Sequence, residues 1–233
     1  MPAFSSFDRR GYPMLSARDG YAQWAASYEQ TIKDDMDRVL LERVSAVAWR
    51  DVARAADLGC GTGRTGAWLR AHGVARVDGI DGSPEMLAQA SARGVFDSLA
   101  VADVGATPLR SGDYDLVTTC LVDEHLADLR PLYRESARLV NAGAHVVIGF
   151  HPFFIMTAGM PTHFDGADGK PVAIETHVHL LSDHVAAAMA AGWQLAELHE
   201  QVIDDTWIAN KPKWAQFRDV PISFAMVWRT PDR

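Results

Sequence analysis

The sequence contains only two cysteines, Cys60 and Cys120, and they form no Cys-x-x-Cys pair. Two isolated cysteines exclude a fold held together by a set of disulfides. No apolar run approaches the roughly 20 residues that cross a bilayer. The N-terminal residues also lack the basic stretch followed by an apolar stretch that marks a secretory signal. We therefore expect a cytoplasmic protein with no membrane partner.

The chain is also poor in lysine, and its arginines are scattered among acidic residues. Its 22 basic and 30 acidic side chains give a formal net charge of −8 at pH 7. Proteins that bind nucleic acid usually carry basic patches that displace the counterions of the phosphates. The charge therefore argues against a nucleic-acid partner and leaves small molecules as the expected ones.

Hydrophobic residues make up 48% of the 233 residues, which is ordinary for a globular chain long enough to bury a large core. As far as Phe150, apolar runs that predict strands alternate with stretches of helical periodicity. This alternation indicates βαβ units around a parallel sheet. The predicted strands are 53–58, 76–81, 97–101, 115–121, 144–150, 195–202 and 222–228, and the predicted helices are 21–49, 65–71, 83–93, 127–139 and 182–191.

The pattern changes after Phe150. Between 151 and 181, Pro, Gly and Asp interrupt the chain and no long helical periodicity is present. In open α/β sheets, ligands bind at the carboxyl edge, which is where this segment leaves the sheet. We expect 151–181 to be a lid over the active-site edge of a single domain, 1–233, in which 21–50 form an N-terminal cap helix. On the same argument, 153–179 and 207–214 should form the outer wall of an acceptor pocket, with the helix after the lid capped by Ser182.

A glycine-rich loop, "ADLGCGTGRTG" (56–66), follows the first of these strands. From Gly61, "GTGRTG" satisfies G-x-G-x-x-G, and Asp81 lies about twenty residues on, as a dinucleotide fingerprint requires. Asp57 argues against that reading, because a carboxylate at the tip of the strand would repel a pyrophosphate. The same carboxylate suits a ligand that carries an ammonium group and a sulfonium.

At this point the sequence resembles the class I S-adenosylmethionine-dependent methyltransferases of the small-molecule type. "ADLGCGTG" is similar to the first motif of that family, "VDGIDGSPEML" to the second and "VADVGATPL" to the third. "DYDLVTTCLVDEHL" resembles the fourth strand, and "ARLVNAGAHVVIGF" the helix, turn and fifth strand. The resemblance implies a Rossmann-like α/β fold, with a seven-stranded, mostly parallel sheet, helices on both faces and an antiparallel last strand. It also implies S-adenosyl-L-methionine as the cofactor.

The resemblance further implies roles for single residues. Gly59, Gly61 and Gly63 would let the backbone approach the methionine part of the cofactor, because they carry no Cβ. Asp57 would orient the ammonium group, and Asp81 would accept hydrogen bonds from both ribose hydroxyls. Asp103 would accept from the adenine amino group. Three further residues are expected along the pocket: Val104, whose N–H would reach a ring nitrogen, and Met86 and Leu121 beside the adenine. Two more, Cys60 and Gly82, are expected within the motif turns.

An alternative reading is that Asp81 and Asp103 merely cap turns, as isolated aspartates often do. Three acids at three consecutive strand ends argue against that reading. From the strand-tip position we also expect that replacing Asp81 would weaken the cofactor while leaving folding nearly unchanged.

The chain segments around these motifs add candidates. In the family, an aromatic N-terminal segment often folds over the cofactor, so Tyr21 and Tyr28 are expected contacts, with a core-facing helix as the alternative. His125, in "VDEHL", matches a position where the family often has histidine, and it can accept a proton from a hydroxyl or amine nucleophile. We predict His125 as the catalytic residue, with its role open. No metal site is expected, because a sulfonium already activates the methyl group.

Three functions fit these motifs. The first is methyl transfer to a small-molecule acceptor by in-line displacement. The second is a non-catalytic domain that binds S-adenosylmethionine and regulates a partner. The third is a nicotinamide-dependent oxidoreductase, which Asp57 and Asp103 disfavour. The acceptor and the oligomeric state are left open by the sequence.

Overall fold

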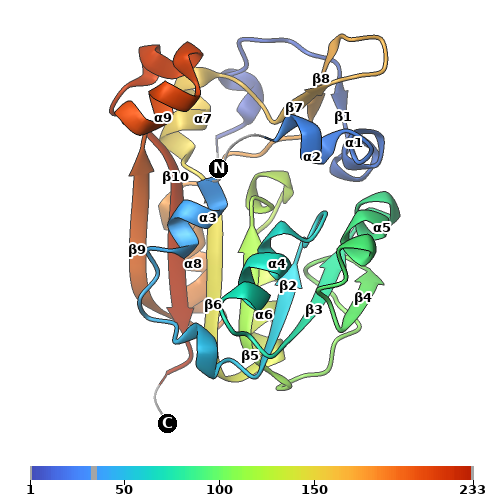
Figure 1. Ribbon diagram of the computed structural model, residues 1–233. Helices are drawn as coiled ribbons and strands as arrows, with labels where there is room; N and C mark the ends of the chain where they lie inside the picture. The colour runs from blue at the N-terminus through green and yellow to red at the C-terminus, as the bar shows by residue number, and fades with distance from the viewer. Residues whose placement is uncertain (1, 33–35, 232–233) are drawn as a thin grey trace.

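The computed structural model describes residues 2–32 and 36–231. Its core is a seven-stranded sheet in the order β4-β3-β2-β5-β6-β10-β9 (Figure 1). The pairs from β4 to β6 are parallel, whereas β10 runs antiparallel to both of its neighbours. The predicted fold class is therefore confirmed. The strands of this sheet are β2 (Arg54–Leu58), β3 (Arg76–Asp81), β4 (Ser98–Val101), β5 (Tyr114–Cys120), β6 (Val140–Phe150), β9 (Gln194–Val202) and β10 (Pro221–Arg229).

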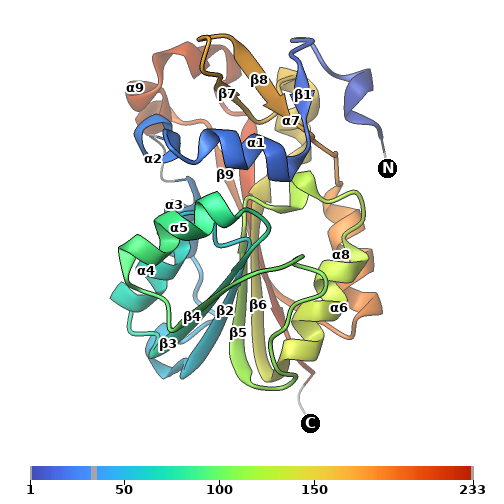
Figure 2. The same cartoon turned by 90° about the vertical axis from the view of Figure 1, so that its right-hand side faces the viewer.

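Helices cover both faces of this sheet (Figure 2). Leu40 and Leu41 on one face and Tyr133 and Leu139 on the other are fully buried, so each face has its own apolar core. Helix α5 begins where the sequence predicts, because Ser83 accepts a hydrogen bond from the Met86 N–H at 3.2 Å and caps the helix. One face carries α3 (Met36–Leu41), α4 (Arg64–Ala71) and α5 (Pro84–Arg93), and the other carries α6 (Arg130–Leu139) and α8 (Leu181–Ala190).

A separate layer lies over the carboxyl ends of the parallel strands (Figure 1). We call it the cap layer and define it as residues 3–32, 152–178 and 203–220. Its small sheet has the order β1-β8-β7, in which β1 pairs parallel with β8. Its elements are β1 (Met14–Leu15), α1 (Ala17–Trp24), α2 (Tyr28–Thr31), α7 (Pro152–Ala158), β7 (His163–Asp165), β8 (Pro171–Ile174) and α9 (Asp205–Asn210), with 3-10 helices η1 (Phe4–Ser6) and η4 (Pro212–Phe217).

The single helix predicted for 21–49, and with it the continuous cap helix 21–50, is wrong. The described part of this segment contains α1, α2, α3 and the 3-10 helix η2 (Trp49–Asp51), and residues 33–35 lie outside the described residues. The Trp24 indole donates a hydrogen bond to Thr31 Oγ1 at 2.8 Å, which fixes the turn between α1 and α2. The apolar spacing that suggested a helix reflects burial of Val44 and Val47 against the sheet instead.

Three further predictions need correction. The lid, expected to have no regular structure, contains the seven-residue helix α7 and the β7–β8 hairpin. His151 caps α7 by accepting a hydrogen bond from the Phe153 N–H. Residues 207–214, expected as a loop, lie mostly in α9 and η4. Ser182 lies inside α8, and Leu180 is the residue that precedes that helix. Within the described chain, none of the helices has the length and apolarity needed to pass through a bilayer.

Candidate active site

The chain order of the main sheet reverses between β2 and β5, because the connection after β4 returns to the other side of β2. In open α/β sheets, ligands bind outside the carboxyl ends of the strands at such a point. The glycine-rich loop begins there, directly after Leu58. Gly59 has a φ of +74°, and a Cβ on it would lie 2.3 Å from Val122 Cγ2. Only glycine therefore fits this first position of the loop.

Asp81 connects this loop to the end of β3. Its Oδ2 accepts a hydrogen bond from the Gly61 N–H at 2.8 Å, and its Oδ1 accepts from the Ser83 N–H at 2.9 Å. Burial raises the pKa of the Asp81 carboxyl, and the two N–H donors oppose that effect. Asp103 likewise accepts from the Gly105 N–H at 2.7 Å. Both aspartates therefore cap turns, as the alternative reading had it, and both also line the cavity described next.

A cavity of about 280 Å³, which we call the loop cavity, opens between the glycine loop, α1 and the segment after β5. It brings together all but two of the predicted site residues. No atom lies within 4 Å of where a Cβ on Gly61 or Gly82 would stand, so both glycines border open space. The predicted residues that line it are Tyr21, Tyr28, Gly59, Gly61, Asp81, Gly82, Met86, Asp103, Val104, Leu121 and His125.

Asp57 and Cys60 do not line the loop cavity. Asp57 is only 1% exposed, and its Oδ1 accepts a hydrogen bond from Thr118 Oγ1 at 2.8 Å. Its Oδ2 has no hydrogen-bond partner among the described residues. Burial raises the pKa of Asp57 to about 7. The Sγ of Cys60 is packed beside Gly79 of β3, and the place of Cys60 in the cofactor site stays a prediction.

His125 lies in the 3-10 helix η3 (Asp123–His125), directly after β5. Its Nδ1 lies 2.7 Å from the Glu175 carbonyl oxygen, which can only accept, so Nδ1 carries the proton. Its Nε2 then accepts from the Tyr21 hydroxyl at 2.9 Å. Burial lowers the pKa of His125, which favours this neutral form. Both ring nitrogens are therefore occupied by the protein itself, and the predicted catalytic role of His125 stays a prediction.

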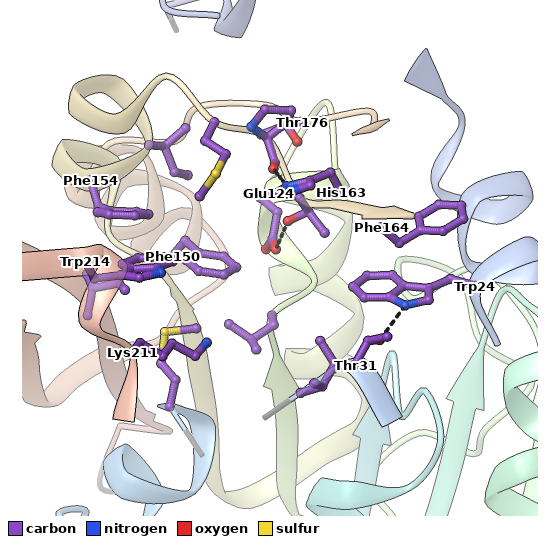
Figure 3. Close-up of a pocket in the computed structure, with 18 of the residues that line it drawn as sticks. Trp24, Thr31, Glu124, Phe150, Phe154, His163, Phe164, Thr176, Lys211 and Trp214 are labelled. Atoms are coloured by element: carbon purple, nitrogen blue, oxygen red, sulfur yellow. Dashed lines mark hydrogen bonds between the residues drawn. The ribbon is translucent and has the colours of Figure 1, made fainter. Parts of the chain in front are cut away.

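A second cavity, of about 340 Å³, lies next to the loop cavity, and we call it the aromatic cavity; Figure 3 shows residues that line it. Tyr21, Tyr28 and Leu121 line both cavities, so the two are neighbours with a shared wall. Its walls hold stacked pairs of rings, Trp24 with Phe164 at 5.4 Å and Phe154 with Trp214 at 5.0 Å between centroids.

The cap layer supplies most of the walls of the aromatic cavity. The segments 153–179 and 207–214, which the sequence predicts to share one wall, both line it. Phe153 itself is 49% exposed and does not take part. Lys211 places its Nζ 5.6 Å from the ring centroids of both Trp207 and Trp214. Met36 and Phe150 also line this cavity, and no sequence motif marked either of them.

Glu124 and Asp165 are the acidic residues that the structure places along the aromatic cavity, and Figure 3 shows the carboxyl group of Glu124 pointing into it. Glu124 is 2% exposed. Its Oε1 accepts a long hydrogen bond from Thr162 Oγ1 at 3.5 Å, and its Oε2 has no partner among the described residues. Burial, and next the nearby charge of Asp123, raise the pKa of Glu124 well above its ordinary value. Glu124 is adjacent to His125 in the sequence, and no role was predicted for it.

The histidines of the lid are distributed among different partners. His151 donates from Nε2 to Glu200, His163 lies against the Pro161 carbonyl oxygen, and His179 against that of Leu126. Across residues 2–32 and 36–231, no group of three or more His, Cys, Asp or Glu side chains could hold a metal ion.

The donor set around the loop cavity fits S-adenosylmethionine. Open space borders two loop glycines, carboxylates stand at the ends of β3 and β4, and apolar Met86 and Val104 line the wall between them. A buried carboxylate oxygen of Asp57 is unpaired below the loop. A sheet with this strand order and such a loop at its reversal point has the class I methyltransferase fold.

Comparison with known proteins agrees with this class. Residues 56–148 match the family model described as a methyltransferase domain. The sequence is 36% identical over 109 residues to human methyltransferase-like protein 27, covering 42% of each chain. It is 34% identical over 94 residues to malonyl-[acyl-carrier protein] O-methyltransferase of Enterobacter lignolyticus, covering 40% of this chain and 37% of that one. The chain thus spans about two fifths of the length of these curated relatives.

Among solved structures, an S-adenosylmethionine-dependent methyltransferase from Mesorhizobium loti aligns with a TM-score of 0.66 and 23% identity. The alignment covers 82% of this chain and 96% of that one, and it establishes the fold. The comparisons therefore show a methyltransferase-like region at residues 56–148 and a methyltransferase fold for the chain.

Proposed function

We propose that this protein transfers the methyl group of S-adenosylmethionine to a small-molecule acceptor. The observation that carries the proposal is the pair of neighbouring cavities, one bordered by the glycine loop and two strand-end carboxylates, the other by aromatic rings. A cavity of about 340 Å³ is in the size range of small-molecule sites. The relative named as an O-methyltransferase is consistent with an acceptor that is not a nucleic acid.

In the loop cavity, this chain would bind the cofactor by the contacts that the family motifs imply. Asp81 would accept hydrogen bonds from the ribose hydroxyls with the lone pairs that Gly61 and Ser83 leave free. Asp103 would accept from the adenine amino group, which Met86 and Val104 would flank. Asp57 does not reach the cavity directly, so its link to the ammonium group would run through water or the loop backbone.

Bound in this way, the cofactor supplies an activated methyl group, and the protein mainly orients the acceptor and excludes water. Tyr21 stands in the wall that the two cavities share and is held there by His125. His125 is in turn held by the carbonyl oxygen of Glu175 in the cap layer. These bonds would keep the boundary between cofactor and acceptor in a fixed position.

Isothermal titration with S-adenosylmethionine, S-adenosylhomocysteine and NAD tests this proposal. We expect micromolar binding of the first two and no binding of NAD. Release of S-adenosylhomocysteine in a mass-spectrometric screen of metabolites would separate an enzyme from a regulatory domain that only binds the cofactor. Heat with NAD alone would refute the proposal.

A further inference from the structure

Lysines are concentrated at the aromatic cavity. The chain has only four lysines and a net charge of −8, and two of the four, Lys211 and Lys213, line this cavity. Its third basic side chain is His163. Neither lysine lines the loop cavity, so neither belongs to the expected cofactor site. Lys213 is exposed, whereas Lys211 is half-buried. Lys211 is therefore the lysine that the fold draws into the cavity.

The position of Lys211 is fixed by the two tryptophans beside it. Its N–H donates to the Trp207 carbonyl oxygen at 2.9 Å, and its own carbonyl oxygen accepts from the Trp214 N–H at 3.0 Å. Its Nζ lies 5.6 Å from the ring centroids of both residues, inside the roughly 6 Å range of cation–π attraction. Figure 3 shows the Lys211 side chain extending from the side of Trp214 into the cavity. The backbone and the ammonium group are thus held by the same pair of residues.

The acidic groups along the cavity leave this positive charge largely unopposed inside it. Asp165 is exposed on β7. Glu124 is buried, and burial together with the nearby charge of Asp123 raises its pKa, which favours its uncharged form. None of the described residues that line this cavity is an arginine. Lysine therefore supplies the positive charge of a site whose walls are otherwise mainly aromatic and apolar.

An ammonium group in such surroundings favours an anionic ligand. It has three N–H donors, so Lys211 can bind a ligand while it keeps a bond to the protein. Attraction between opposite charges is stronger where bulk water is excluded, and hydrogen bonds between charged groups are stronger than those between neutral ones. A single ammonium matches the single charge of a carboxylate, whereas phosphate sites commonly combine arginines or several backbone N–H groups.

We propose that Lys211 binds a carboxylate of the methyl acceptor, and that the acceptor is a flat, apolar carboxylic acid. This inference rests on the proposed function and names its substrate class. The stacked ring pairs on the walls, Trp24 with Phe164 and Phe154 with Trp214, fit a flat apolar body. The ammonium group of Lys211 then fixes which way that body lies between the rings.

The carboxylate serves to orient the acceptor rather than to receive the methyl group. Lys211 lines the aromatic cavity but not the loop cavity, whereas Tyr21, Tyr28 and Leu121 line both. The group that receives the methyl must lie at this shared wall, because the cofactor is expected in the loop cavity. It is therefore a different group of the acceptor from the carboxylate that Lys211 binds.

The first test is binding of 2-naphthoate and of its neutral analogue 2-naphthamide to the full chain saturated with S-adenosylhomocysteine, measured by isothermal titration. We expect 2-naphthoate to bind about tenfold more tightly or better, the order expected for a charge-assisted hydrogen bond. Added salt should weaken 2-naphthoate and leave 2-naphthamide unchanged, because salt screens the attraction between charges. This measurement needs no variant.

The second test assigns the preference to Lys211. Lys211→Met keeps the length of the side chain and removes its charge, so it should weaken 2-naphthoate about tenfold or more and leave 2-naphthamide within about threefold. Lys211→Arg restores the charge and should restore the preference for 2-naphthoate. Lys170→Met is the matched control, because Lys170 is an exposed lysine outside the cavity, and it should bind both compounds as wild type does. Circular dichroism and S-adenosylhomocysteine affinity would establish that each variant is folded.

Several results would overturn the inference while leaving the proposed function intact. One is S-adenosylmethionine binding with no saturable binding of 2-naphthoate, and another is equal affinity of wild type for 2-naphthoate and 2-naphthamide. An equal loss of both compounds in Lys211→Met, or no recovery in Lys211→Arg, would mean that Lys211 only supports the cavity wall. Tighter binding of 2-naphthylmethylammonium than of 2-naphthoate would mean that Asp165 and Glu124 select cations instead. Absence of S-adenosylmethionine binding would refute the proposed function itself.

Discussion

Asp57 should make the protein less stable at alkaline pH, and replacing it with asparagine should remove that effect. The carboxyl is 1% exposed, accepts one hydrogen bond from Thr118 and has an unpaired second oxygen. Asparagine has nearly the same shape and can still accept from Thr118, but it carries no charge. The Asp57→Asn change therefore tests the cost of ionising a carboxyl below the glycine loop.

The size of the effect follows from the pKa. Folding raises the pKa of Asp57 from its ordinary 3.8 to about 7, which corresponds to about 4 kcal/mol as an upper limit. Between these pH values the folded protein holds the proton and the unfolded chain does not, so stability falls as pH rises from about 4 to 7. Asparagine would leave its own amide N–H groups unpaired, which costs roughly 1–3 kcal/mol. We therefore expect Asp57→Asn to gain about 1–2 kcal/mol at pH 8.5 and nothing, or a small loss, at pH 5.

Urea unfolding followed by circular dichroism, at several pH values from 5 to 8.5, measures this directly. Asp51→Asn is a suitable control, because Asp51 is exposed and its replacement should leave the pH dependence unchanged. If wild type and Asp57→Asn give parallel curves across this range, Asp57 is ionised at no cost and the reasoning is refuted. Saturating S-adenosylmethionine should stabilise wild type more than Asp57→Asn at pH 8.5 if the carboxylate supports the ammonium group.

Three further changes test the loop and the cap layer. Asp81→Ala should weaken S-adenosylmethionine by about 1–3 kcal/mol in titration, and it should also lower the free energy of unfolding by about 1–3 kcal/mol, since Gly61 and Ser83 lose their acceptor. An unchanged affinity would contradict the ribose role. Gly59→Ala should abolish measurable cofactor binding and cost at least 1 kcal/mol in stability, because φ is +74° and the new Cβ would overlap Val122; wild-type binding would show that the loop tolerates a side chain. Trp214→Ala removes the ring stacked on Phe154 and should increase proteolytic cleavage of the cap layer with little change in S-adenosylmethionine affinity; equal cleavage would show that the pair does not hold the layer.

From its strand-end position, Asp81 was expected to be replaceable with little effect on folding. That position alone does not show which hydrogen bonds the side chain makes. The sequence located Asp81 correctly at the last residue of β3. It could not show that both carboxylate oxygens already accept backbone hydrogen bonds from the loop and from the start of α5. The residue therefore supports the fold and lines the cavity at once, and the prediction for its replacement changes accordingly.

Most strands of the main sheet were predictable because they are short segments rich in apolar residues with glycine, aspartate or proline at or near their ends, whereas β9 (Gln194–Val202) mixes apolar and polar residues. The loop cavity was predictable for a related reason, since its residues stand at fixed positions relative to those strand ends. The cap layer has no such rule. Its sheet pairs Met14 and Leu15 with Ala173 and Ile174, residues far apart in the chain, and strands this short leave no period for a sequence pattern to show.

The surroundings of Glu124 also depend on distant parts of the chain that a sequence pattern does not show. In the sequence, "VDEHL" offers three neighbouring ionisable residues, and titration near neutrality made His125 the natural choice among them. The structure separates the three by their surroundings: Asp123 faces His184, His125 lies between Tyr21 and Glu175, and Glu124 alone of the three lines the aromatic cavity. Those partners come from α1, α8 and the end of the β7–β8 hairpin, three segments with no motif in common. Which of these adjacent residues reaches a cavity is therefore decided by distant segments of the chain. The choice of methyl acceptor should likewise depend on the cap layer more than on the motifs around the cofactor.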